Sequence, residues 1–143
     1  MLRTDMPKKA RAKKKLSRRE LRDLDLEIRF LEGVIERDPK FIDALRVLSG
    51  DYHKRGRRPD AVRIDEYLAQ LNSDDPLAHY NLACSYALAH QFSHAIMALI
   101  RAIDSGYSHF HQILRDPDLA ALRKHPLFEK VLARIEAIEV KVS

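Results

Sequence analysis

The stretch HYNLACSYALAHQFSHAIMALIRAI, residues 79–103, is the part of the chain that says most about its fold. Its apolar and small residues recur every three or four positions, the spacing of one helix face, on either side of a break at His90-Gln91. A shift of the sequence by 34 residues superposes a similar pattern, which pairs Leu48 with Leu82, Tyr52 with Tyr86, Ala61 with Ala95 and Val62 with Ile96. The sequence therefore predicts two copies of a helix pair.

Both copies share one packing pattern. A Leu and a Tyr four residues apart lie on one face of the first helix, and an Ala nine residues after the Tyr allows the second helix to approach closely. One such pair cannot bury both of its faces, so neighbouring pairs are expected to stack. No run in the sequence has the alternating period of a strand, and we therefore expect an all-α fold.

Capping signals mark the ends of further helices. Ser17 and Glu20 have the spacing of a capping box, and Asp38-Pro39 is expected to end the helix that begins there. Gly56 and the segment 72–76 interrupt the helical pattern downstream. We expect Asp116-Pro117 and His125-Pro126 to open two short terminal helices.

The 34-residue period, residues 79–87, and the pairs Ala95-Ile96 and Ala102-Ile103 resemble the tetratricopeptide repeat family. This resemblance implies a right-handed α-solenoid of antiparallel helix pairs, with about seven or eight helices in total. It divides a domain over 18–143 into a half unit (18–39), a repeat (42–75), a second repeat (76–109) and a degenerate closing unit (110–143). The first repeat matches more loosely, because Leu68 replaces the small residue that corresponds to Ala102.

Charge is concentrated at the N-terminus. Residues 1–22 hold ten Lys or Arg and two acidic residues, a net charge of +8, whereas the remaining residues hold 16 Lys or Arg and 19 acidic residues, a net charge of −3. Residues 1–17 lack apolar periodicity, so we expect a disordered basic tail. Its candidate polyanion-binding residues, with the start of the first helix, are Lys8, Lys9, Arg11, Lys13, Lys14, Lys15, Arg18 and Arg19.

The tail has three interpretations: a solubility device, a contact to nucleic-acid phosphates, or a contact to an anionic membrane. No aromatic residue interleaves the basic block, so nucleic-acid binding would be non-specific. A second basic cluster, residues 54–58, lies at an expected turn and is a candidate extension of the same footprint. No apolar run is long enough for a membrane span, and we expect a cytoplasmic protein.

The family resemblance also indicates a binding groove lined by the first helix of each pair. The candidate groove residues are Arg46, His53, Lys54, Tyr80, Asn81, Cys84 and Arg115, with Asp43, Val47, Leu77, Leu88 and His111 beside them. Some family members hold the C-terminal carboxylate of a partner with Asn and basic residues. Asn81, Arg46 and Arg115 match such positions, but Gly50, Leu77 and His111 do not. The groove thus has two interpretations, an incomplete carboxylate clamp or an unspecialised polar groove.

We find no catalytic or metal-binding pattern. The pairs His90/His94 and His109/His111 lack further ligands at suitable spacing, and the single cysteine, Cys84, is more typical of a small apolar residue than of a nucleophile. Asp116 is expected to cap a helix, and Asp118 to lie in its first turn, where an acidic side chain interacts favourably with the helix dipole. The sequence thus predicts a non-enzymatic adaptor without cofactor or metal that binds a peptide or helix. The alternative is a nucleic-acid- or ribosome-associated protein that uses its tail.

Overall fold

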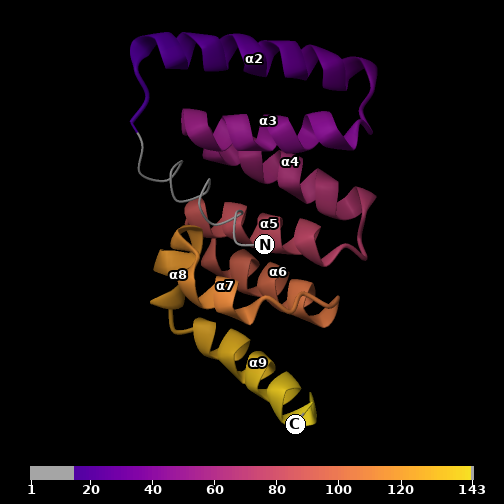
Figure 1. Ribbon diagram of the computed structural model, residues 1–143, viewed down its shortest axis with the longest axis vertical. Coiled ribbons are helices and arrows are strands. Elements are labelled where there is room, and N and C mark those ends of the chain that lie inside the picture. The colour runs from indigo at the N-terminus through magenta and orange to yellow at the C-terminus, as the bar shows by residue number, and fades with distance from the viewer. Residues whose placement is uncertain (1–14, 143) are drawn as a thin grey trace. The chain divides into compact units, whose positions relative to one another are not determined.

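The computed structural model describes residues 15–142. This part of the chain is helical and contains no strand, which confirms the all-α class and the expected number of helices. It divides into two compact units between Leu71 and Asn72. The elements are α2 (Arg18–Arg37), α3 (Ile42–Arg55), α4 (Arg58–Leu71), α5 (Pro76–Leu88), α6 (Phe92–Asp104), α7 (Phe110–Arg115), the 3₁₀ helix η2 (Pro117–Leu119), α8 (Ala120–Arg123) and α9 (Phe128–Val142) (Figure 1).

The N-terminal unit contains α2, α3 and α4. Helix α2 begins with the predicted capping box: the Glu20 amide donates to Ser17 Oγ at 3.1 Å, and the Ser17 amide donates to Glu20 Oε2 at 2.9 Å. Helix α2 packs on α3, and α3 packs on α4. Their shared core contains Leu24, Ile28, Leu31, Ala44, Leu48, Tyr52 and Ala61, with the half-buried Leu16 packed against it. Leu16 thus belongs to the packed unit, although the sequence pattern placed it in the tail.

The C-terminal unit is built on the α5–α6 pair. Asp75 caps α5 by accepting the Leu77 amide at 3.0 Å, and Pro76 occupies the first turn, where a missing amide hydrogen is harmless. Small residues line the packed faces of the two helices, and Ala83, Ala95 and Ala102 are fully buried. Helix α9 packs on α6 and buries Phe128, Val131 and Ile135.

The repeat is visible in the turns that end α3 and α5. The Arg57 amide donates to the Tyr52 carbonyl at 2.8 Å, and the Gln91 amide donates to the Tyr86 carbonyl at 2.9 Å, which is the longer hydrogen bond of a Schellman motif. The residue before each donor is left-handed: Gly56 has φ of 83° and His90 has φ of 60°. The same turn thus recurs after one 34-residue period, with histidine in place of glycine.

Replacing the left-handed histidine gives a simple test of this turn. His90→Gly is expected to raise the free energy of unfolding by about 0.5 to 1 kcal/mol, because glycine avoids the steric cost of a side chain at positive φ. Ala89→Gly is the matched control, since Ala89 has φ of −87° and glycine there should destabilise the helix end. Urea unfolding followed by circular dichroism measures both; a loss of stability in His90→Gly would contradict the assignment.

The C-terminal region departs in detail from the expected two short helices. Asp116-Pro117 opens η2, which runs into the single turn of α8, whereas the segment after His125-Pro126 forms the longer helix α9. Helix α7 precedes them within the stretch expected to be a degenerate closing unit. Among the described residues, no helix is long and apolar enough to cross a bilayer.

Candidate partner-binding surface

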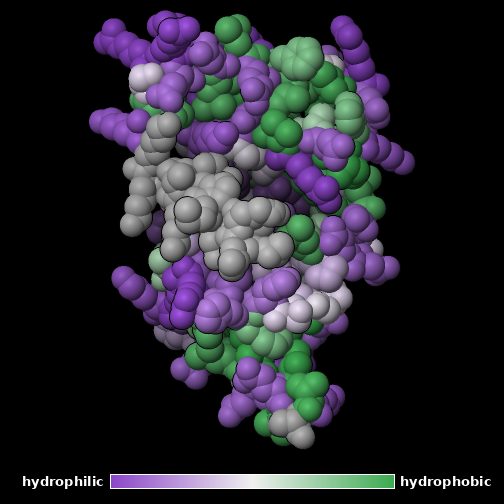
Figure 2. Space-filling view, viewed as in Figure 1, coloured by the Kyte–Doolittle hydropathy of each residue, from purple (hydrophilic) through white to green (hydrophobic). Residues whose placement is uncertain are grey.

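In the N-terminal unit, the predicted groove residues of α3 form one solvent-facing stripe. Asp43, Arg46, Val47 and Lys54 are exposed, and Val47 retains 48% of its surface. Gly50 lies between them along the helix, and a Cβ built there meets no atom within 4 Å. The stripe offers two cationic groups and one carboxylate beside an apolar side chain and an open stretch of backbone. Figure 2 shows that hydrophilic and hydrophobic side chains alternate over the visible face of the N-terminal unit.

His53 does not belong to this stripe, although it was predicted to line the groove. Its side chain is only 15% exposed, and its Nε2 lies 3.8 Å from Oδ2 of the buried Asp65 in α4. Its Nδ1 lies 3.4 Å from Nη1 of Arg58. The imidazole therefore links α3 to α4, because position 53 faces the partner helix of the pair rather than solvent.

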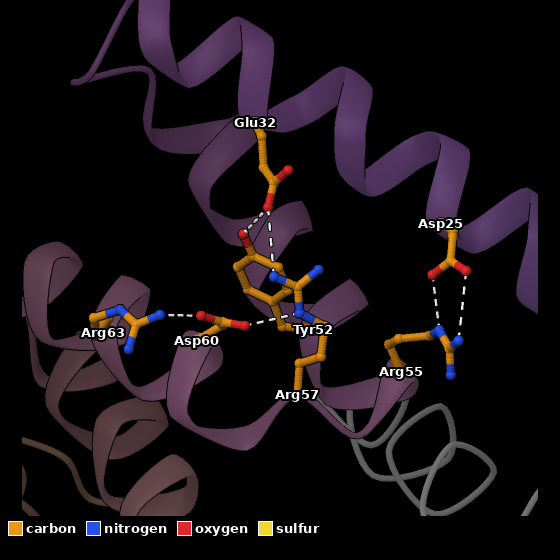
Figure 3. A network of polar contacts seen from close by, with 7 residues as sticks. All are labelled: Asp25, Glu32, Tyr52, Arg55, Arg57, Asp60 and Arg63. Carbon is orange, nitrogen blue, oxygen red and sulfur yellow. Dashed lines mark hydrogen bonds and ion pairs between the residues drawn. The ribbon is translucent and has the colours of Figure 1, made fainter.

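The basic cluster at the α3–α4 turn pairs with acidic side chains of its own unit (Figure 3). Arg55 Nε donates to Asp25 Oδ1 of α2 at 2.7 Å, and this guanidinium lowers the pKa of the Asp25 carboxyl. Arg57 Nε donates to Asp60 Oδ2 at 2.7 Å. Asp60 also accepts from Arg63. Two of the four charges that were expected to extend a phosphate-binding footprint, those of Arg55 and Arg57, are thus paired with acidic side chains within the fold, whereas Lys54 is exposed.

Arg57 holds a second set of contacts that join all three helices of this unit. Its guanidinium lies 4.6 Å from the centre of the Tyr52 ring, and its Nη2 lies 3.7 Å from Glu32 Oε2. The Tyr52 hydroxyl donates to the same Glu32 oxygen at 2.5 Å. Burial and the Glu32 carboxylate raise the pKa of Tyr52 to about 12. This network fixes the turn and the docking of α2, so its role is structural.

In the C-terminal unit, the predicted groove positions divide into surface and buried residues. Leu77 on α5 retains 50% of its surface, and Asn81 and Leu88 on the same helix are half-buried. His111 and Arg115 on α7 are exposed. The surface positions of α5 are thus apolar or carry an amide, and those of α7 carry an imidazole and a guanidinium.

Tyr80 and Cys84 lie beneath that surface rather than on it, with 2% and 4% exposure. The Tyr80 hydroxyl donates to Oδ2 of Asp116 at 2.6 Å, and Cys84 Sγ lies 3.8 Å from the same oxygen. The Tyr80 ring stacks on Tyr107 with centroids 4.4 Å apart. Burial, and then the charges of Cys84 and Asp116, raise the pKa of Tyr80. A partner at the surface therefore cannot contact either side chain directly, which corrects their assignment to the groove.

Asp116 is the centre of this buried network. It is 1% exposed, it accepts from Gln112 Nε2 at 3.2 Å, and it caps η2 by accepting the Asp118 amide at 3.0 Å. Arg123 donates to the Asp116 carbonyl at 2.8 Å and to the Ile113 carbonyl at 3.0 Å. The predicted cap is therefore confirmed, and the same carboxylate also anchors α5. Local spacing could not reveal this second role, because Tyr80 lies 36 residues upstream.

Asp116 also belongs to a group with metal-ligand atoms. Possible ligand atoms of Cys84, Asp116 and Asp118 lie within 4.8 Å of one another. This is the one such group among the described residues, and it contains no histidine. The Asp116 oxygens already accept hydrogen bonds from Tyr80, Gln112 and the Asp118 amide. A cation would have to displace donors that hold the unit together, so the geometry fits a structural cluster better than a metal centre.

The predicted polyanion-binding residues are only partly covered by the structure. Lys8, Lys9, Arg11, Lys13 and Lys14 lie outside the described residues. Lys15, Arg18 and Arg19 are exposed at the start of α2. These three side chains form a cationic surface at the N-terminal end of α2.

Comparison with known proteins gives a partial similarity. No family model matches the chain, and no solved structure matches it. The chain is 33% identical over 88 residues to a chloroplastic protein of Arabidopsis thaliana, a match that covers 59% of this chain. Because the match covers only 26% of the Arabidopsis protein, the chain corresponds to about a quarter of that relative's length.

Proposed function

We propose that the chain is a non-enzymatic adaptor of the tetratricopeptide-repeat type, which binds a peptide or helix at the exposed positions of α3 in the N-terminal unit or of α5 and α7 in the C-terminal unit. The observation that carries the proposal is the stripe on α3, where Arg46, Val47 and Lys54 are exposed around the open Gly50. Equivalent positions on α5, one 34-residue period later, include the half-exposed Leu77. Recurrence of the turn after α3 and α5 supports the repeat assignment.

The chemistry of these positions favours a partner with acidic and apolar groups. Arg46 and Lys54 in one unit and Arg115 in the other are exposed cations, while Val47 and Leu77 offer half-exposed apolar contacts. An extended or helical segment with alternating acidic and apolar side chains would satisfy both kinds of group. The buried Cys84 and the structurally paired His53 support a binding role rather than catalysis.

The test combines Asn81→Ala with Arg115→Glu. Capture of protein partners from a lysate is expected to fall on the order of tenfold, because the double variant removes one cluster of favourable contacts from the proposed binding surface. The melting temperature should stay nearly unchanged, because surface substitutions usually alter stability by less than about 0.5 kcal/mol. Lys130→Glu is the charge-matched control, since Lys130 is exposed on α9, away from the proposed surface.

Two outcomes would contradict the adaptor proposal. Unfolding of the double variant would assign Asn81 and Arg115 to the fold rather than to a surface. Unchanged protein capture, combined with loss of binding after nuclease treatment or deletion of residues 1–14, would favour the tail-based nucleic-acid interpretation instead.

A further inference from the structure

A buried acidic residue of α3 has one carboxylate oxygen without a hydrogen-bond partner among the described residues. Asp51 lies on α3 with 2% exposure, and its Oδ2 has no hydrogen-bond partner in the described part of the chain. The nearest carboxyl that acts on it is that of Glu27 on α2, whose side chain is exposed. When Asp51 is ionised, its buried carboxylate carries a desolvation cost and is repelled by Glu27. A proton on Asp51 supplies the missing donor and removes the repulsion.

The surrounding charges do not compensate the pair. Burial, followed by the hydrogen bond and charge of Glu27, raises the pKa of Asp51 to about 7, and only the Lys54 charge acts in the opposite direction. The other charged groups at the contacts of α3 with α2 and α4 already have partners: Asp25 with Arg55, Glu32 with Tyr52 and Arg57, Asp60 with Arg57 and Arg63, and Asp65 with His53.

We propose that Asp51, next to Glu27, acts as a proton-dependent latch, which holds α2 firmly on α3 when Asp51 is protonated and loosens it when Asp51 is ionised. The latch lies beside the apolar contacts that α2 makes through Leu24, Ile28 and Leu31. The covalent link from α2 to α3 is the short connection 38–41. Loosening it would uncover the buried residues of α3, including Leu48 and Tyr52. This inference does not depend on the proposed adaptor function.

The direction of the pH effect follows from proton binding. In the docked state the pKa of Asp51 is raised to about 7, whereas an undocked Asp51 has its ordinary pKa of 3.8. Because the docked state binds more protons between these values, docking weakens as the pH rises, by at most about tenfold per pH unit. Above about pH 7.5 both states are ionised, and the dependence on this pair ends.

Hydrogen exchange of the α2 amides, corrected for the intrinsic pH dependence of exchange, measures the docking equilibrium. In the full chain, protection of α2 is expected to fall on the order of 30-fold to 100-fold between about pH 5 and pH 7, and then to level off. Asp51→Asn should abolish most of this change, and Glu27→Gln should reduce it. Asp23→Asn is the control, because Asp23 is an exposed acid on the same helix and should leave the profile unchanged.

The proposal is overturned if the wild-type chain and Asp51→Asn show the same pH profile. Should Asp51→Asn fail to fold, the carboxyl ¹³C chemical shift of Asp51 in the wild-type chain decides the question. A midpoint near about 7 supports the latch, whereas a midpoint near about 4 contradicts it. Glu27→Gln should lower that midpoint, because it removes the neighbouring negative charge.

Discussion

Asp116→Ala is expected to lower the free energy of unfolding by about 3 kcal/mol. The substitution leaves the buried Tyr80 hydroxyl without its acceptor at 2.6 Å and removes the cap on the Asp118 amide at 3.0 Å. It also removes the acceptor for Gln112. Helix α5 thereby loses its polar anchor to the α7–η2 junction, and urea unfolding followed by circular dichroism measures the loss.

The control for this prediction is Asp118→Ala. Asp118 is half-buried in the first turn of η2, so its loss should cost less than about 1 kcal/mol. Tyr80→Phe removes the other end of the buried hydrogen bond. Because the two residues contact each other, the effects of Tyr80→Phe and Asp116→Ala should not add in the double variant. Additive effects, or wild-type stability of Asp116→Ala, would show that the network contributes little.

Local signals in the sequence predicted the helices well because their causes are local. The capping box of Ser17 and Glu20 and the Asp75-Pro76 start of α5 each depend on residues within one turn of helix. The 34-residue shift also identified matching turns, because a Tyr and a left-handed residue four positions later recur together. These features require no knowledge of how one helix packs on another.

The surface was harder to predict, because helical periodicity does not say which flank of a helix meets the next element. Asn81 keeps part of its surface, while its neighbour Tyr80 is buried and donates to Asp116, far along the chain. Similarly, Arg55 and Arg57 stand in a basic run that looks solvated, yet α2 supplies Asp25 and Glu32 to meet them. Asp51 resembles an ordinary helical acid until its burial is known.

Ala95→Leu is expected to lower the free energy of unfolding by about 1 to 3 kcal/mol. Ala95 is completely buried on α6, the helix that packs on α5, and the same face carries the buried Ala98 and Ala102. A larger side chain must displace a neighbour or adopt a strained rotamer, because small residues set the close approach of the two helices. Thermal unfolding followed by helical circular dichroism should show a lower midpoint.

Ala61, which lies 34 residues before Ala95, allows the same test in the N-terminal unit. Ala61 is also completely buried, on α4, so Ala61→Leu should destabilise the N-terminal unit in the same way. Met97→Leu should have almost no effect, because Met97 retains 70% of its surface on the helix that carries Ala95. If only one alanine tolerates leucine, the two pairs differ in how closely their helices pack; if both tolerate it, small residues do not control the pairing.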